Sequence, residues 1–186
     1  MHHAYLSIRE LKFMCAAHII SPMKSTANIL GALALSITDQ IHTITQQVLA
    51  RSGETSAAII IIGYVPGISV EVLRQVLGLS HPGTVRLIDR LRDDGYVERQ
   101  KAKDGRAVAL HLTQSGNALR TSLMEARLDL LQGALDGLST EEQQTLGTLL
   151  AKVLKTLPES EMDKHRICRL CSVQACPDCP IRGNAI

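Results

Sequence analysis

The stretch that decides the fold runs from Leu79 to Arg99 and reads LSHPGTVRLIDRLRDDGYVER. Ser80 is a residue type that caps helix N-termini, and Pro82 is well tolerated in the first turn of a helix. Apolar residues then recur at helical spacing until Gly95, a residue type that commonly follows a helix C-terminus. They are Val85, Leu87, Ile88 and Leu91. The pattern predicts a helix over residues 80–92.

A second, shorter helix is predicted directly upstream, over residues 70–77. Ser69 stands at its N-cap position, and Gly78 follows its last residue. Only Gly78 and Leu79 then separate this helix from the next one. Two short helices joined by so tight a turn are typical of a helix-turn-helix.

A β-hairpin is predicted after this pair of helices. Residues 96–100 and 107–112 favour strands, and the charged turn between them carries Asp104-Gly105 at its tip. Apolar residues at helical spacing flank the whole region, over 37–50 and over 113–157. The expected fold class is therefore mainly α with a small β-wing, a winged helix-turn-helix within a helical dimerisation frame.

The expected domain organisation has four parts. The flanking helices carry more apolar surface than one small domain can cover, which favours a two-fold partner. No apolar run approaches the roughly 20 residues of a membrane span, so we expect a cytoplasmic chain without a membrane partner. The parts are an N-terminal extension (1–22), a helical dimerisation region (23–53 and 113–157), a winged helix-turn-helix DNA-binding domain (54–112) and a cysteine-rich tail (158–186).

Composition narrows the kind of partner. Aromatic residues make up 2% of the chain, which argues against proteins that stack the bases of single strands or of RNA. The formal net charge is +2, so a nucleic-acid surface has to be a local patch. Between Arg74 and Arg106 there are eight Lys or Arg and five Asp or Glu, an excess of three positive charges over the predicted helix pair and wing.

Three segments, 79–99, 103–107 and 110–116, resemble the MarR family of transcriptional regulators. The similarity extends over residues 37–157. It implies a homodimer that binds double-stranded DNA at pseudo-palindromic operators, most often as a repressor. It also implies release of the DNA by an effector, which in this family is a small phenolic molecule, a metal or an oxidant.

The resemblance places the DNA contacts on helix 80–92, with residues 81–84 and Arg86 facing outward, and on the wing. Arg86 is the predicted bidentate contact to guanine, and Ser80 and Thr84 would serve phosphates or base edges. In the wing, Asp104 would orient Arg106 toward the backbone or the minor groove. The expected DNA-binding set is Ser80, His81, Pro82, Gly83, Thr84, Arg86, Arg90, Lys101, Lys103, Asp104 and Arg106.

Two positions depart from the family's pattern. Gly105 stands where the family often has a second Arg, which leaves Lys101 and Lys103 to contact phosphates as point charges. Arg74 replaces a small residue between the two short helices, and would either lean toward a phosphate or alter the helix spacing. Arg90 has an alternative role, which is to brace its own helix against Asp89, Asp93 or Asp94.

The tail carries four of the five cysteines, in two Cys-x-x-Cys pairs separated by four residues. Four thiolates can close a tetrahedral zinc site. The Cys179-Pro180 sequence is equally typical of iron–sulfur ligands. A reversible disulfide switch and cysteines without any bound metal are the remaining alternatives. The candidate ligands are Cys168, Cys171, Cys176 and Cys179.

Two functions compete at this stage. The first is a sequence-specific DNA-binding regulator whose affinity responds to metal, redox state or a small ligand. The alternative is a metal- or iron–sulfur-binding protein that uses the helix-turn-helix as a protein-interaction scaffold, a role that needs no basic helix and wing. An enzyme is not expected, because the sequence holds no phosphate-binding loop, dinucleotide-binding glycine motif or nucleophile elbow.

Overall fold

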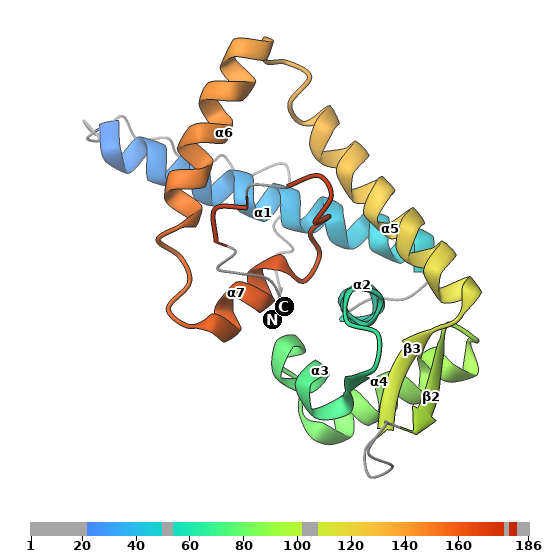
Figure 1. The fold of residues 1–186 in the computed structure, drawn as a ribbon. Coiled ribbons are helices and arrows are strands. Elements are labelled where there is room, and N and C mark those ends of the chain that lie inside the picture. The colour runs from blue at the N-terminus through green and yellow to red at the C-terminus, as the bar shows by residue number, and fades with distance from the viewer. Residues whose placement is uncertain (1–21, 50–53, 102–107, 177–178, 182–186) are drawn as a thin grey trace, which may run out of the picture. The chain divides into compact units, whose positions relative to one another are not determined.

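The computed structural model describes residues 22–49, 54–101, 108–176 and 179–181, and Figure 1 shows its ribbon. The chain divides into two compact units, one up to Ile37 and one from Thr38 to Ile186. Helix α1 (Pro22–Leu49) runs through this division. The predicted N-terminal extension lies outside the described residues, apart from its last residue. Among the helices that the structure describes, none is long and apolar enough to cross a membrane.

Three helices build the helix-turn-helix region: α2 (Thr55–Tyr64), α3 (Val70–Leu77) and α4 (His81–Asp93). The predicted caps are present. The Ser69 hydroxyl accepts a hydrogen bond from the Val72 amide at 3.2 Å, and the Ser80 hydroxyl accepts one from the Gly83 amide at 3.2 Å. Gly78 ends α3 with φ of 68°, a left-handed conformation that favours glycine.

The wing is an antiparallel sheet in the order β1-β3-β2. Strands β2 (Val97–Lys101) and β3 (Val108–Leu112) form the predicted hairpin, in a register that pairs Val97 with Leu112. A two-residue strand, β1 (Ile68–Ser69), pairs with the outer side of β3 and was not predicted. It connects the sheet to the start of α3, so the wing and the helix pair form one packed domain.

The core of this domain lies between α2, α3, α4 and the sheet. Helix α2 is buried from Thr55 to Ile62, as expected for a helix that is apolar on all sides. Each fully buried Leu or Ile stabilises the fold by about 1.5–3 kcal/mol relative to an exposed one. The largest fully buried side chains include Ile59, Ile62, Leu73, Ile88, Leu91 and Leu110.

Two further helices follow the wing, α5 (Gln114–Gly133) and α6 (Thr140–Leu154). Thr113 caps α5, and Ser139 with Glu142 forms the predicted capping box of α6. Helix α6 has no buried residue. It instead exposes a row of large apolar side chains, continued just past its end: Leu149, Leu150, Val153 and Leu157. The predicted fold class, mainly α with a small β-wing, is confirmed.

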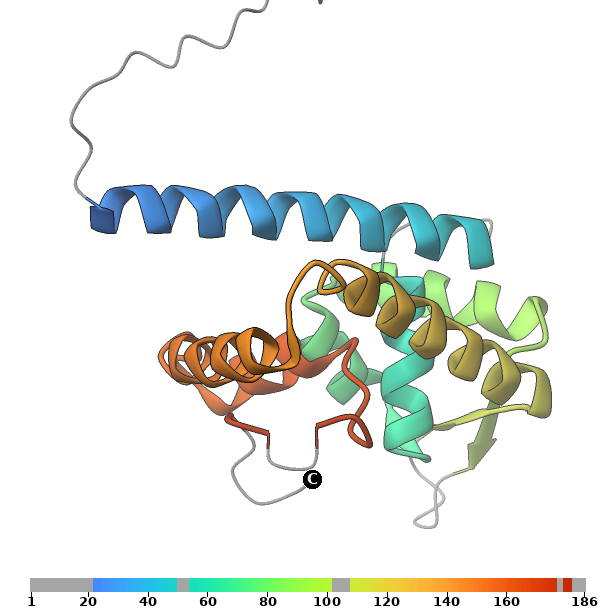
Figure 2. The same cartoon turned by 90° about the horizontal axis from the view of Figure 1, so that it is seen from above.

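The tail differs most from the expectation. The sequence after Pro158 is too polar to predict a packed element, but it forms helix α7 (Glu161–Cys168), which packs against α3. Met162 and Leu170 pack against the core, and Ile181 is buried. Figures 1 and 2 both show the dark red segment that follows α7 lying beside α2. The tail is therefore part of the winged helix-turn-helix unit.

Candidate nucleic-acid interface

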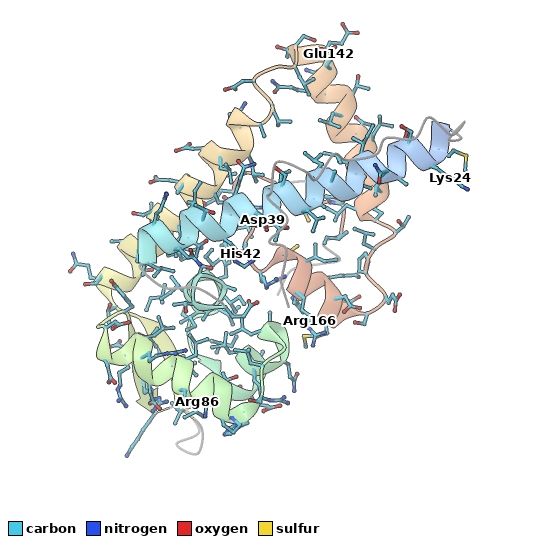
Figure 3. The ribbon with its side chains drawn as sticks, turned by 180° about the vertical axis from the view of Figure 1, so that it is seen from behind. Lys24, Asp39, His42, Arg86, Glu142 and Arg166 are labelled. Carbon is cyan, nitrogen blue, oxygen red and sulfur yellow. The ribbon has the colours of Figure 1, made fainter. Side chains whose placement is uncertain are left out.

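Helix α4 has two distinct faces. Leu87, Ile88 and Leu91 are buried in the core, and they fix the rotation of the helix about its axis. His81, Pro82, Arg86 and Arg90 are exposed, and Figure 3 labels Arg86 at the outer edge of this region. The helix thus presents two guanidinium groups and its N-terminal turn to the surroundings, as a recognition helix requires.

Thr84 does not belong to the outward face, and the prediction that it faces outward is wrong. Its side chain is fully buried, and its hydroxyl donates a hydrogen bond to the Ser80 carbonyl at 3.1 Å. Thr84 lies three, four and seven residues before Leu87, Ile88 and Leu91, so helical geometry places it on their face. Ser80 stays exposed, but its hydroxyl is engaged as the cap of α4.

Two acidic residues of α4, Asp89 and Asp93, are paired with cations other than Arg86 and Arg90. Arg92 pairs with Asp93 at 2.8 Å and with Asp89 at 3.5 Å. Arg99 on β2 pairs with Asp89 at 3.0 Å. Bracing by a basic residue, suggested for Arg90, is therefore seen for Arg92. These pairs limit the repulsion that the acidic side chains would exert on a phosphate backbone.

The structure describes the two long strands of the wing but not the turn between them. Lys101, the last residue of β2, is exposed. The predicted contacts Lys103, Asp104 and Arg106 fall on residues 102–107, outside the described part of the chain. Strands β2 and β3 are paired as far as Lys101 and Val108, the residues on either side of that segment.

Arg74, the departure between the two short helices, is engaged within its own helix. Its guanidinium bonds the Glu71 carboxylate through two hydrogen bonds of 2.6 and 2.9 Å. This hydrogen bonding from Arg74 lowers the pKa of the Glu71 carboxyl to about 2. Part of the positive charge counted in the patch is therefore already balanced locally.

Three contacts hold the tail to the helix-turn-helix. The Tyr64 hydroxyl, at the end of α2, donates to the Cys171 carbonyl at 2.9 Å and accepts from the Val173 amide at 3.1 Å. The Arg166 guanidinium donates to the Gln75 carbonyl near the end of α3 at 3.1 and 3.3 Å, and Figure 3 labels it on α7. Arg169 pairs with Glu54 at 3.4 Å.

The cysteine side chains meet beside these contacts. The Cys168 thiol hydrogen-bonds with Cys171 and interacts with Cys179 as well, which raises the pKa of Cys168. The hydrogen bond from Cys168, helped by the charge of Arg127, lowers the pKa of Cys171 to about 6. Within the described ranges, no three His, Cys, Asp or Glu side chains already stand in an arrangement that holds a metal ion.

Sequence reasoning missed Tyr64 and Arg166. Tyr64 ends a long apolar run, and the one available signal was that a tyrosine hydroxyl next to a core usually finds a hydrogen-bond partner. Arg166 had no signal of its own, because its partner is a backbone carbonyl 91 residues away in the chain.

Comparison with known proteins identifies the domain. Residues 52–107 match the model of the MarR family. An uncharacterized HTH-type transcriptional regulator of Bacillus subtilis (strain 168), YwhA, is 30% identical over 84 residues, which are 45% of this chain and 60% of that protein. The matched segment thus spans less than two thirds of the relative's length.

Solved structures agree in fold. The reduced form of MarR from E. coli is 28% identical with a TM-score of 0.57, over 69% of this chain and 96% of that one. Streptococcus pneumoniae FabT, in complex with DNA, is 22% identical with a TM-score of 0.60, over 70% and 96% of the two chains. YusO from Bacillus subtilis is 16% identical with a TM-score of 0.64, over 74% and 99%. The resemblance seen in the sequence is confirmed: residues 52–107 match the MarR family model, and the chain has a winged helix-turn-helix fold similar to that of MarR.

Proposed function

We propose that this chain is a sequence-specific regulator of transcription that binds double-stranded DNA and acts as a repressor. The observation that carries the proposal is the outward face of α4, where Arg86 and Arg90 stand exposed while the opposite face is locked in the core. A guanidinium held in this way can form the bidentate contact to guanine that reads sequence in the major groove. A protein of the same fold, FabT, has been solved in complex with DNA.

The regulator acts as a homodimer on pseudo-palindromic operators. The supporting observation is the apolar row of α6, whose four large side chains are each between 43% and 57% exposed. A second copy of the chain is the natural cover for such a row, because self-association about a two-fold axis buries the same surface on both partners. Two copies of α4 would then enter successive turns of the major groove.

A small-molecule effector belongs to the same proposal. Ile41, Ile44, Leu123 and Arg127 line a cavity of about 10 Å³ between α1, α2 and α5. This volume is close to that of one water molecule, so an effector has to widen the cavity as it binds. The Nε atom of Arg127 is buried and makes no hydrogen bond within the described residues. An acidic or phenolic group that reached this nitrogen would satisfy it, since an unpaired buried donor is costly.

The test is a binding titration with the full chain and a labelled promoter fragment from beside its own gene, at several salt concentrations. We expect Arg86→Ala to weaken binding by about 5- to 150-fold, because a bidentate base contact is worth about 1–3 kcal/mol. The matched control is Arg92→Ala, which removes the same charge from the same helix but from a side chain already paired with Asp89 and Asp93.

Affinity should also fall steeply with salt, because phosphate contacts release counterions. Equal losses for Arg86→Ala and Arg92→Ala would show that charge alone is recognised and not sequence. Binding that ignored both Arg86→Ala and salt would contradict the proposed function.

A further inference from the structure

We propose that Cys168, Cys171, Cys176 and Cys179 bind one zinc-type divalent ion through four thiolates, and that this ion fastens the tail to the winged helix-turn-helix. The proposal does not depend on DNA binding. It follows from how the chain brings the two Cys-x-x-Cys pairs to one place.

The first pair is formed by a tight turn at the end of α7. Cys168 is the last residue of that helix, and the Cys171 amide donates a hydrogen bond to the Cys168 carbonyl at 2.9 Å. The turn sets both thiols on the same side of the chain, where they hydrogen-bond with each other. Cys-x-x-Cys turns of this kind are a common way of supplying two ligands to one metal ion.

The second pair returns to the first. Cys179 lies within interaction range of the Cys168 thiol, although ten residues lie between the two in the sequence. Cys176 belongs to the same Cys-x-x-Cys unit as Cys179 and is half-buried. Since the described side chains do not yet form a three-ligand group, binding has to draw the second pair inward.

Both pairs are anchored to the same domain by contacts that do not involve sulfur. The Tyr64 hydroxyl holds the backbone on either side of Ser172, at Cys171 and Val173. Ile181, two residues after Cys179, is buried. Binding of an ion therefore requires little further ordering of the chain, because these contacts already hold the backbone near the cysteines and most of its conformational entropy is lost before the ion binds.

A zinc-type ion fits the contact between the first two thiols, Cys168 and Cys171. Zinc–sulfur bonds of about 2.3 Å in a tetrahedron place neighbouring sulfurs about 3.8 Å apart, a separation close to that of thiols in hydrogen-bond contact. In a four-iron cluster each cysteine sulfur binds a different iron atom and the sulfurs lie further apart, whereas a two-iron cluster would be revealed by iron and sulfide in the purified protein. Arg127, close enough to act on the charge of Cys171, would offset part of the negative charge of four thiolates.

The test uses the reduced, metal-free full chain titrated with Zn²⁺, and with Co²⁺ as a spectroscopic probe of tetrahedral thiolate ligation. We expect one ion per chain in the wild type. Serine substitution at each of the four positions should abolish stoichiometric binding. The matched control is Cys15→Ser, which makes the same change at the one cysteine outside the tail.

A second measurement avoids the risk that the variants misfold. In the wild type, Zn²⁺ should protect all four tail thiols from alkylation and leave the reactivity of Cys15 unchanged, as read by mass spectrometry. The proposal is overturned by the absence of stoichiometric binding, by equal loss in Cys15→Ser, or by iron and sulfide in anaerobically purified protein. None of these results bears on DNA binding, which is measured separately.

Discussion

Tyr64→Phe tests whether the tail is held in place by the end of α2. The substitution removes only the hydroxyl, which donates to the Cys171 carbonyl at 2.9 Å and accepts from the Val173 amide at 3.1 Å. The ring stays, and with it the stacking of the Arg120 guanidinium 4.2 Å from the ring centre. Any effect is therefore due to the loss of the hydroxyl, that is of these two hydrogen bonds and of a weaker contact with the Met124 sulfur at 3.7 Å.

The expected magnitude follows from those two bonds. Each half-buried hydrogen bond contributes about 0.5–1.5 kcal/mol, so docking of the tail should weaken by about 1–3 kcal/mol. The population in which the tail is detached then rises by about 5- to 150-fold. The loss is local, because the core residues of α2, α3 and α4 keep their contacts.

Hydrogen exchange read by mass spectrometry measures this population segment by segment. Peptides that cover α7 and residues 169–176 should exchange faster by the same factor, while peptides from α4 and β3 should be unchanged. Tyr96→Phe is the matched control, since it removes a tyrosine hydroxyl at the β2 end of the same domain. Unchanged exchange in the tail of Tyr64→Phe, or equal acceleration in both variants, would refute the reasoning.

Four further predictions address the cap, the packing, the charges and the metal. Thr84→Val should lower the free energy of unfolding by about 0.5–1.5 kcal/mol in denaturant titrations, because the Thr84 hydroxyl donates to the Ser80 carbonyl. DNA affinity should not change. A loss of affinity without a loss of stability would show that Thr84 contacts DNA. Gly116→Ala should lower the free energy of unfolding by about 1–3 kcal/mol, since a Cβ there would meet the Tyr96 carbonyl oxygen. Gly133→Ala, at the other end of α5, places its Cβ in open space and should leave the free energy of unfolding nearly unchanged. The pKa of Glu71 is lowered from 4.5 to about 2, so its ion pair stabilises the fold fully above pH 4.5 and is lost as the pH falls toward 2. The difference in melting temperature between wild type and Glu71→Gln should vanish over that range. A difference that persisted at pH 2 would contradict the role given to this ion pair. Addition of Zn²⁺ to the metal-free chain should slow hydrogen exchange over residues 161–176, and a chelator should reverse this; exchange that ignored both treatments would show that the tail is not fastened by metal.

Local signals in the sequence were sufficient for the helix pair and the wing. Ser69, Ser80 and Thr113 cap helices where their residue types predict it, because a cap depends only on residues within one turn. The hairpin was predictable for the same reason. Strand β1 was not, since two residues carry no periodicity and Ile68 is extended only through its pairing with Leu110.

The candidate site shows where a position carried over from a family misleads. Thr84 was assigned to the outward face by position, from the resemblance to the MarR family, yet its spacing from Leu87, Ile88 and Leu91 already placed it on the buried face. The packing of the tail could not be predicted, because its pattern is too weak to read. Its buried anchor, Ile181, and its half-buried ones, Met162 and Leu170, are spread over 20 residues, too sparse for any periodic pattern, and their burial depends on a surface formed by distant helices.

The tail contacts α3, which in turn packs against the recognition helix α4. It leaves Arg86 and Arg90 on α4 exposed. Arg166 bonds the Gln75 carbonyl, near the end of α3, and α3 packs against both α7 and α4. A metal that only steadied the tail would raise the free energy of unfolding and leave DNA affinity unaltered. A metal that shifted α3 would change the presentation of Arg86. Its effect on DNA affinity would then depend on Arg166, since that side chain connects α7 to α3 through the Gln75 carbonyl. Arg166→Ala should therefore separate the two cases, because it preserves the four thiols while removing the connection through which their state would reach α4.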